Sequence, residues 1–279
     1  KLEGVREGSA ESSSPSITLE RTQAVAPFAP RWPRVGSQQA SGVYMASDTP
    51  EAVHLLDAVI RSRKSVRAFR PDPVPKRLLI EIIETARAAP SNFNSQPWRV
   101  YMLTGRAKDA FGDALRRAYD ANTTPPFSPF PPQTPGEYMA RVGEFGRRLY
   151  SALEIARSDM AGRARQTGLN FGFFDAPVGM IFTTDGALSR HSWLDCGLFV
   201  QSVILAAQVR GLATCPQVSF VRFQSVIAEQ LRLAPDEMVT CGMSCGYEDA
   251  QAPVNHLAMP REPLEVISRW LGFEEDLEE

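Results

Sequence analysis

The sequence lacks several features that would place it in common functional classes. Its 279 residues include only four cysteines and three histidines. Four cysteines are too few for the disulfide framework of a small secreted domain, and the histidines lie too far apart for the usual spacing of zinc ligands. Neither Gly-x-Gly-x-x-Gly nor Gly-x-x-x-x-Gly-Lys-Ser/Thr occurs. We therefore expect no metal site and no Rossmann or P-loop nucleotide site.

Long apolar runs and a strong charge imbalance are also missing. No stretch of about 18 apolar residues is present, so we expect no membrane-spanning helix. A formal net charge of −2 gives no global attraction to nucleic acid or to acidic membranes. The scarcity of cysteine favours a reduced protein. The sequence thus predicts a cytoplasmic protein with neither a nucleic-acid nor a membrane partner.

The composition changes along the chain. Residues 1–50 are rich in serine, proline, glycine and charge, and we expect either a leader or an arm that lies on other structure. Residues 51–272 carry the periodic apolar patterns of one folded domain, and residues 273–279 form an acidic tail. The proline-rich tract 123–135 is too apolar for a simple tether, so we expect a lid insertion over about 120–165.

Apolar spacing within the domain predicts both helices and strands. Helical spacing covers 51–60, 75–88, 106–120, 137–165, 191–210 and 264–271, and strand patterns cover 99–104, 177–184 and 239–247. Helices and strands alternate imperfectly and the helices predominate. This pattern favours an α+β fold, with one sheet surrounded by helices, over a Rossmann fold.

The segment from Arg61 to Arg70 concentrates positive charge. It holds five cations and two serines in ten residues. Guanidinium and hydroxyl groups bind phosphate through charge-assisted hydrogen bonds, so this segment is a candidate phosphate site. The alternative is a solvated helix end whose cations favour the C-terminal dipole.

A second polar segment, Ala89-Pro-Ser-Asn-Phe-Asn-Ser-Gln-Pro-Trp98, follows the helix expected at 75–88. Its amides can donate to and accept from the edge of a heterocycle. A third tract, Gly211–Phe220, contains Cys215, which is either a thiol nucleophile or, more simply, a buried packing residue.

These segments in this order resemble the FMN-dependent nitroreductase superfamily, which includes flavin reductases and reductive dehalogenases of the iodotyrosine deiodinase kind. The resemblance covers about residues 51–272 and depends on Arg63-x-Ser65-x-Arg67-x-Phe69 and Pro90-Ser91-Asn92-x-Asn94-Ser95-Gln96-Pro97-Trp98. It implies a nitroreductase-like α+β fold with a mostly antiparallel central sheet and an interlocked homodimer.

The resemblance also implies the positions of the cofactor contacts. Arg63, Ser65 and Arg261, with Lys64 nearby, would hold the FMN phosphate, and Arg67 would lie at the pyrimidine edge of the flavin. The partner subunit would supply the second group of contacts, and a backbone loop would face flavin N5 and O4. The second group is Pro90, Ser91, Asn92 and Asn94, and the loop is Pro216, Gln217, Val218 and Ser219.

The implied activity is the reduction of nitroaromatic compounds by NADH or NADPH, in a ping-pong transfer through flavin N5. Reductive dehalogenation or quinone/flavin reduction on the same scaffold is the nearest alternative, and a non-catalytic flavin-binding module is a remote one. Aromatic side chains in or near the expected lid could stack on a small aromatic substrate, although each could equally be a packing residue. These are Phe127, Phe130, Tyr138 and Phe145.

Overall fold

One antiparallel sheet organises the described part of the chain. The computed structural model describes residues 50–123 and 128–273, and within them four strands pair in the order β1-β2-β4-β3. The strands are β1 (Arg99–Thr104), β2 (Val178–Asp185), β3 (Ala213–Gln217) and β4 (Glu237–Gly246). All three pairs are antiparallel, and the register of β2 against β4 shifts between Phe182 and Thr183. The expected α+β fold with an antiparallel sheet is confirmed.

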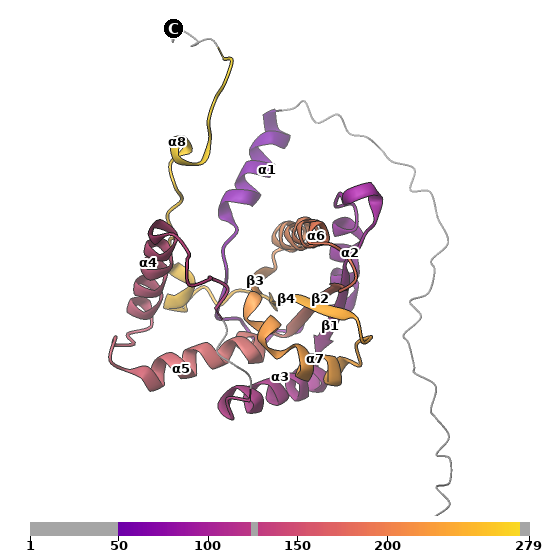
Figure 1. The fold of residues 1–279 in the computed structure, drawn as a ribbon, viewed down its shortest axis with the longest axis vertical. Helices are drawn as coiled ribbons and strands as arrows, with labels where there is room; N and C mark the ends of the chain where they lie inside the picture. The colour runs from indigo at the N-terminus through magenta and orange to yellow at the C-terminus, as the bar shows by residue number, and fades with distance from the viewer. Residues whose placement is uncertain (1–49, 124–127, 274–279) are drawn as a thin grey trace, which may run out of the picture. The chain divides into compact units, whose positions relative to one another are not determined.

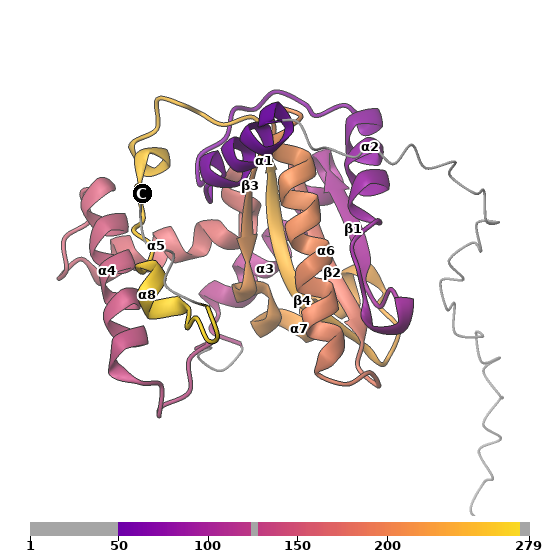
Figure 2. The same ribbon diagram turned by 90° about the horizontal axis from the view of Figure 1, so that it is seen from above.

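Helices cover both faces of this sheet. The helices are α1 (Pro50–Ser62), α2 (Lys76–Ala86), α3 (Gly105–Asp120), α4 (Gly136–Ala152), α5 (Met160–Gly168), α6 (His191–Gln208), α7 (Gln224–Leu231) and α8 (Leu264–Ile267). Helices α2 and α6 lie on one face, and α3 and α7 lie on the other (Figure 1). Helices α4 and α5 lie beyond the β3 edge of the sheet (Figure 2). None of the described helices is long and apolar enough to cross a bilayer.

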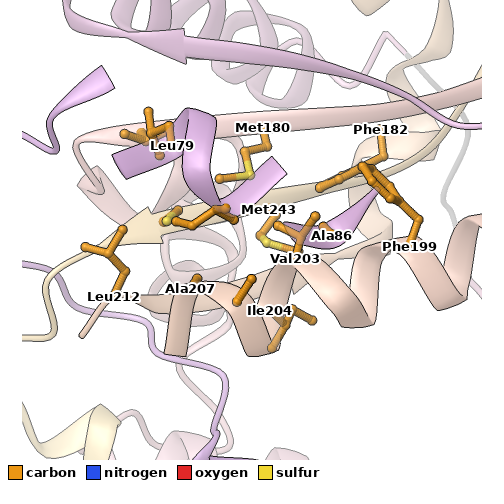
Figure 3. Packing of buried hydrophobic residues seen from close by; sticks show 14 of the residues in the cluster. Leu79, Ala86, Met180, Phe182, Phe199, Val203, Ile204, Ala207, Leu212 and Met243 are labelled. Atoms are coloured by element: carbon orange, nitrogen blue, oxygen red, sulfur yellow. The ribbon is translucent and has the colours of Figure 1, made fainter. Parts of the chain in front are cut away.

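The core between α6 and the sheet is built from large apolar side chains. Phe199 and Val203 of α6 point toward Phe182, Met180 and Met243 of the central strands (Figure 3). The ring of Phe199 also stacks on Trp98, with centroids 4.8 Å apart and planes 1° from parallel. Because both central strands are covered on two faces, nearly all of their residues are buried.

The opposite face holds a cluster of phenylalanines that requires glycine in the strands. The Phe173 and Phe220 rings lie 4.9 Å apart. A Cβ atom at Gly179 would come within 2.6 Å of Phe173, and one at Gly242 within 2.4 Å of Phe220. The expectation that small residues in the 239–247 strand allow close approach is therefore confirmed at Gly242.

Several expected elements differ in the structure. Strand β3 and helix α7 were not expected. For β3 the reason is that Pro216 and the small residues around it suggest irregular chain. Strand β3 lies at the sheet edge, where a proline can be accommodated without losing a ladder hydrogen bond. The helical segments expected over 137–165 are α4 and α5, whereas the expected 264–271 helix ends at Ile267. Residues 1–49, which form nearly all of the expected N-terminal arm, lie outside the described residues, as does 274–279 of the acidic tail.

Replacing Phe199 by alanine should lower the free energy of unfolding by about 3–5 kcal/mol, because it leaves a cavity beside Trp98 and Phe182. Urea denaturation at fixed protein concentration measures this loss. Ile80→Ala is the control: its side chain is 52% exposed and should cost about 1 kcal/mol or less. Equal losses in the two variants would contradict the packing described here.

Candidate active site

The basic segment is fixed along the edge of the sheet by backbone hydrogen bonds. The Val66 N–H donates to the Thr214 carbonyl of β3 at 3.0 Å, and the Arg70 N–H donates to the Tyr247 carbonyl at 2.9 Å. Val66 is 1% exposed, whereas its neighbours Ser65 and Arg67 line a cavity. Since side chains alternate in extended chain, burying Val66 directs the polar side chains away from the core.

Asn255 ties the C-terminal tract to this segment. Its side-chain oxygen accepts from the Arg67 N–H at 2.8 Å, and its amide donates to the carbonyls of Ala68 at 2.8 Å and Asp249 at 2.9 Å. Asn255 is 1% exposed, so these bonds are shielded from water. The tract that leads to Arg261 is thereby held against residues 63–70.

A positively charged cavity lies between these two segments. Its volume is about 780 Å³, and five of its lining residues are cations: Arg61, Arg63, Lys64, Arg67 and Arg261. No aspartate or glutamate is among its lining residues in the described part of the chain. Such a cavity suits an anion, and the arginines suit phosphate in particular.

The cations of this cavity differ in how far they are engaged. Lys64 is paired with Glu248 at 2.7 Å, which neutralises part of its charge. Arg261 donates to the carbonyls of Met259 and Pro260 at 2.9 and 3.1 Å. Arg63 has no carboxylate within 4.0 Å among the described residues. Arg67 likewise has no carboxylate partner among the described residues and donates only to the Ser65 carbonyl, at 3.1 Å. Arg63, Arg67 and Arg261 thus keep their charge available to a ligand.

A smaller compartment of about 300 Å³ adjoins the first and shares Arg67 and Phe145 with it. The Arg67 guanidinium lies 5.2 Å from the centre of the Phe145 ring. All four residues of the tract Pro216–Ser219 line this compartment. The two spaces therefore meet at Arg67, where a ligand bound by its phosphate in the first could extend into the second.

Side-chain hydrogen bonds hold the 216–219 tract in place. Gln217 is 4% exposed; its amide donates to the Asn170 carbonyl at 2.8 Å, and its oxygen accepts from the Ser244 hydroxyl at 2.7 Å. The Ser219 hydroxyl oxygen is buried and has no hydrogen-bond partner within the described residues. A buried polar atom without a partner is costly.

The amide-rich turn lies elsewhere in the same chain. Pro90, Ser91, Asn92 and Asn94 line neither compartment. The Asn92 N–H instead donates to Asp195 of α6 at 3.1 Å. The adjacent Phe93 is 98% exposed. Within one chain, the structure therefore brings together the basic segment, Arg261 and the 216–219 tract, but not this turn.

The aromatic residues expected in the lid are dispersed. Phe145 of α4 lines both compartments. Tyr138 lies outside them, with the Arg141 guanidinium 4.6 Å from its ring centre, and Phe130 lines neither. Phe127 is outside the described residues.

Sequence reasoning missed residues that line or support the site. Tyr150, Gln166 and Asn170 line the smaller compartment, and Asn255 and His256 line the larger. Gln166 and Asn170 are four positions apart, a helical spacing that could have indicated one face. Asn255 lies in an irregular tract with no periodic signal.

Two side chains that suggest nucleophilic catalysis are buried. Burial raises the pKa of the Cys215 thiol, although Arg67, a hydrogen bond with Ser65, and Arg63 each act to lower it. Gly242-Met-Ser-Cys-Gly246 matches Gly-x-Ser-x-Gly, but Ser244 lies within β4 at 0% exposure and donates to Gln217. It is not on the exposed strand-to-helix turn that a serine nucleophile needs. Of the two alternatives for Cys215, the packing role agrees with this burial.

Comparison with known proteins agrees with this arrangement. Residues 60–247 match the family model described as the Nitroreductase family. The chain belongs to the nitroreductase family. Membership of the superfamily expected from the two motifs is thereby confirmed.

The alignments with known relatives and solved structures cover most of this nitroreductase chain. A 4-nitrobenzoate reductase of Pseudomonas putida is 48% identical over 218 residues, covering 78% of this chain and 96% of the relative. A nitrobenzene nitroreductase of Ectopseudomonas oleovorans is 41% identical, covering 77% and 96%. The FMN-dependent nitroreductase NfnB of Mycobacterium smegmatis, solved in complex with NADPH, is 30% identical, covers 78% of this chain and 99% of its own, and has a TM-score of 0.75.

Asn255→Ala should loosen residues 63–70, because it leaves the Arg67 N–H without a partner and removes one of the two hydrogen bonds that the Ala68 carbonyl accepts. We expect the free energy of unfolding to fall by about 1–3 kcal/mol and amide hydrogen exchange in peptides covering 63–70 to accelerate. Gln251→Ala, an exposed change in the same tract, is the control. Unaltered exchange in the Asn255 variant would refute the role given to this side chain.

All four cysteines are buried, and the raised pKa of Cys215 keeps its thiol protonated at pH 8 to a greater extent than that of a free cysteine. Iodoacetamide at pH 8 should therefore leave the native protein largely unlabelled and modify every cysteine after unfolding in urea. Mass spectrometry of the labelled peptides measures this. Rapid, selective labelling of native Cys215 would instead identify an activated thiol.

Proposed function

We propose that this chain is an FMN-dependent oxidoreductase that reduces nitroaromatic compounds with NADH or NADPH. The observation that carries the proposal is the cationic cavity that meets a second compartment at Arg67. This arrangement fits a molecule with a phosphate at one end and a planar, polar-edged ring at the other. The relatives named above as nitroreductases support the same activity.

The residues present fit FMN. Arg63, Ser65 and Arg261 would hold the phosphate, with Lys64 contributing less because Glu248 already pairs with it. The ring would extend past Arg67 toward the 216–219 tract, where the unpartnered Ser219 hydroxyl and the backbone N–H groups of Gln217, Val218 and Ser219 are the candidate polar contacts. Bound FMN supplies the chemistry: it accepts hydride from a nicotinamide and passes two electrons to an acceptor.

The protein groups act through charge and position. Arg67 is a permanent cation beside the ring position and stabilises negative charge there, more strongly in a partly dry site than in water. Phe145 packs over its guanidinium and limits the approach of water. Gln217 holds the 216–219 backbone rigid through its bonds to Asn170 and Ser244. Ping-pong turnover follows if the nicotinamide leaves before the acceptor binds at the same face of the flavin.

We further infer that the site is completed in a homodimer. Two observations support this: the amide-rich turn is remote from the cavity of its own chain, and large apolar side chains remain exposed on α1 and on the C-terminal segment. Apolar patches of this kind mark interaction surfaces. They comprise Val53, Leu55, Leu56 and Ile60 of α1, and Val266, Ile267, Trp270, Leu271 and Phe273. In the dimer, Pro90, Ser91, Asn92 and Asn94 reach the partner's flavin.

The 120–165 segment would act as the lid of this site through Phe145. Phe127, Phe130 and Tyr138 remain candidates for stacking on the aromatic substrate. The use of NADH or NADPH as electron donor and the four free cysteines both fit a cytoplasmic location.

Arg63→Ala and Arg261→Ala should each weaken FMN binding by about 1–3 kcal/mol, the scale of a lost charged hydrogen bond. Quenching of flavin fluorescence during titration of the apoprotein gives the dissociation constants. Arg70→Ala is the matched control, because Arg70 belongs to the same basic segment but pairs with Asp72 outside the cavity. Wild-type affinity in both test variants would exclude the phosphate assignment, and absence of nitroaromatic reduction by the FMN-loaded wild type would exclude the proposed activity.

A further inference from the structure

Two walls of the smaller compartment are joined by one buried side chain. One wall is the 216–219 tract at the end of β3, and the other contains Gln166, Thr167 and Asn170, where α5 ends. The Gln217 amide nitrogen donates to the Asn170 carbonyl at 2.8 Å and to the Asn170 side-chain oxygen at 3.2 Å. Gln217 is 4% exposed, so these bonds are shielded from water. The separation of the two walls therefore depends on this amide.

The orientation of the Gln217 amide is fixed by the chemistry of its partners. The Asn170 backbone carbonyl can only accept a hydrogen bond, so the amide nitrogen must face it. The amide oxygen then faces Ser244 of β4, whose hydroxyl donates to it at 2.7 Å. Ser244 is 0% exposed. The serine of the Gly-x-Ser-x-Gly sequence is thus a buried hydrogen-bond donor that orients Gln217.

The Gln217 side chain does not serve the turn that follows it. Gln217 precedes the short helix η3 (Val218–Phe223), yet its side chain makes no capping hydrogen bond there. Three residues further on, Phe220 is 0% exposed within the phenylalanine cluster. Val218 and Ser219 therefore lie between a polar anchor and an apolar anchor, and both line the compartment. An apolar side chain could fill the interior at position 217 without the cost of burying an amide, so the amide indicates a directional role.

We propose that Gln217 and Ser244 are positioning residues that set the width of the smaller compartment and hold Val218 and Ser219 against a bound flavin ring. This inference rests on the proposed function. Neither Gln217 nor Ser244 lines the cationic cavity, so both act on the ring and not on the phosphate. Loss of a hydrogen bond leaves a buried amide atom without a partner, and the walls shift to relieve that cost.

Riboflavin, which has the flavin ring but no phosphate, provides the test. Titration of the apoprotein, followed by flavin fluorescence, measures its affinity and that of FMN. Gln217→Met removes all three hydrogen bonds at similar volume, and it should weaken both ligands by the same factor, about 5- to 50-fold. Ser244→Ala should weaken both by a smaller factor, because the bonds to Asn170 remain. Arg63→Ala, in contrast, should weaken FMN and change riboflavin affinity by about twofold or less.

Thr240→Val is the matched control for Ser244→Ala. The Thr240 hydroxyl is also buried in β4, but it donates to the Phe182 carbonyl within the sheet, at 3.1 Å. Its removal should lower the free energy of unfolding as Ser244→Ala does, while leaving both flavin affinities unchanged. The comparison separates a positioning role from a general loss of stability.

Gln217→Glu gives a pH profile that packing alone would not produce. When protonated, the introduced carboxyl can donate to the Asn170 carbonyl and accept from Ser244, as the amide does; when ionised, it can only accept. Burial favours the protonated form. Riboflavin affinity in this variant should therefore be low at about pH 8 and recover as the pH falls toward about 5, unlike that of the wild type measured in parallel. Arg67 is the one charged side chain among the described lining residues, and it is common to both proteins.

Failure of this inference can be distinguished from failure of the proposed function. Unaltered riboflavin affinity in Gln217→Met and Ser244→Ala, losses no larger than that of Thr240→Val, or a pH-independent affinity in Gln217→Glu would overturn the positioning role and leave the FMN-dependent activity intact. A wild-type protein that binds neither FMN nor riboflavin would instead refute the proposed function itself.

Discussion

The site depends on the side chain of Asn255. Its three hydrogen bonds join the backbone of Arg67 and Ala68 to the C-terminal tract at Asp249 and Asn255, which is far away along the sequence. Besides them, the backbone hydrogen bond from the Asp249 N–H to the Ala68 carbonyl, at 3.1 Å, joins the start of this tract to the basic segment. The salt bridge between Arg141 and Glu262 fixes the same tract to α4 at its other end. Hydrogen bonds between uncharged groups thus hold together two segments that both carry positive charge, and the cationic cavity lies between these segments.

Placing several cations around one cavity costs energy in the absence of an anion, since like charges repel. The protein reduces that cost only partly, by pairing Lys64 with Glu248 and by directing Arg261 at backbone carbonyls. The remaining positive potential favours phosphate. The second compartment has a different character, because Arg67 is its one cation among the described residues: the side chains of Phe145, Leu149 and Phe174 line it together with neutral polar side chains. These are Tyr150, Gln166, Thr167, Asn170, Gln217 and Ser219. This division between phosphate binding and ring binding is what a flavin site requires.

The sequence predicted the features that depend on local patterns. Strand β1 has the bounds expected at 99–104. Strands were also expected at 177–184 and 239–247, and β2 and β4 lie there, buried along nearly their whole length. Strand β3 was not predictable from its own residues, since Pro216 is tolerated only because the strand lies at an edge. The apolar stripe of α1 predicted a helix correctly, but Val53, Leu56 and Ile60 remain exposed within the chain. The described residues of the chain leave that stripe uncovered.

The residues of the candidate site also fall into those that the sequence indicated and those that it did not. The motif at 63–67 indicated a phosphate site because its residue types bind phosphate wherever they occur. Asn255 and Tyr150 carried no such signal, because their places in the site depend on contacts made only after folding. The amide-rich turn shows the limit most clearly: the motif is present, but its own chain places it beside Asp195 of α6.

A crystal structure of the FMN-loaded protein tests the central claim most directly. The account predicts that the phosphate lies within hydrogen-bonding distance of Arg63, Ser65 and Arg261 of one protomer, with the turn at 90–94 of a second protomer beside the same flavin. A phosphate bound away from the basic segment, or a site formed by one chain alone, would contradict it.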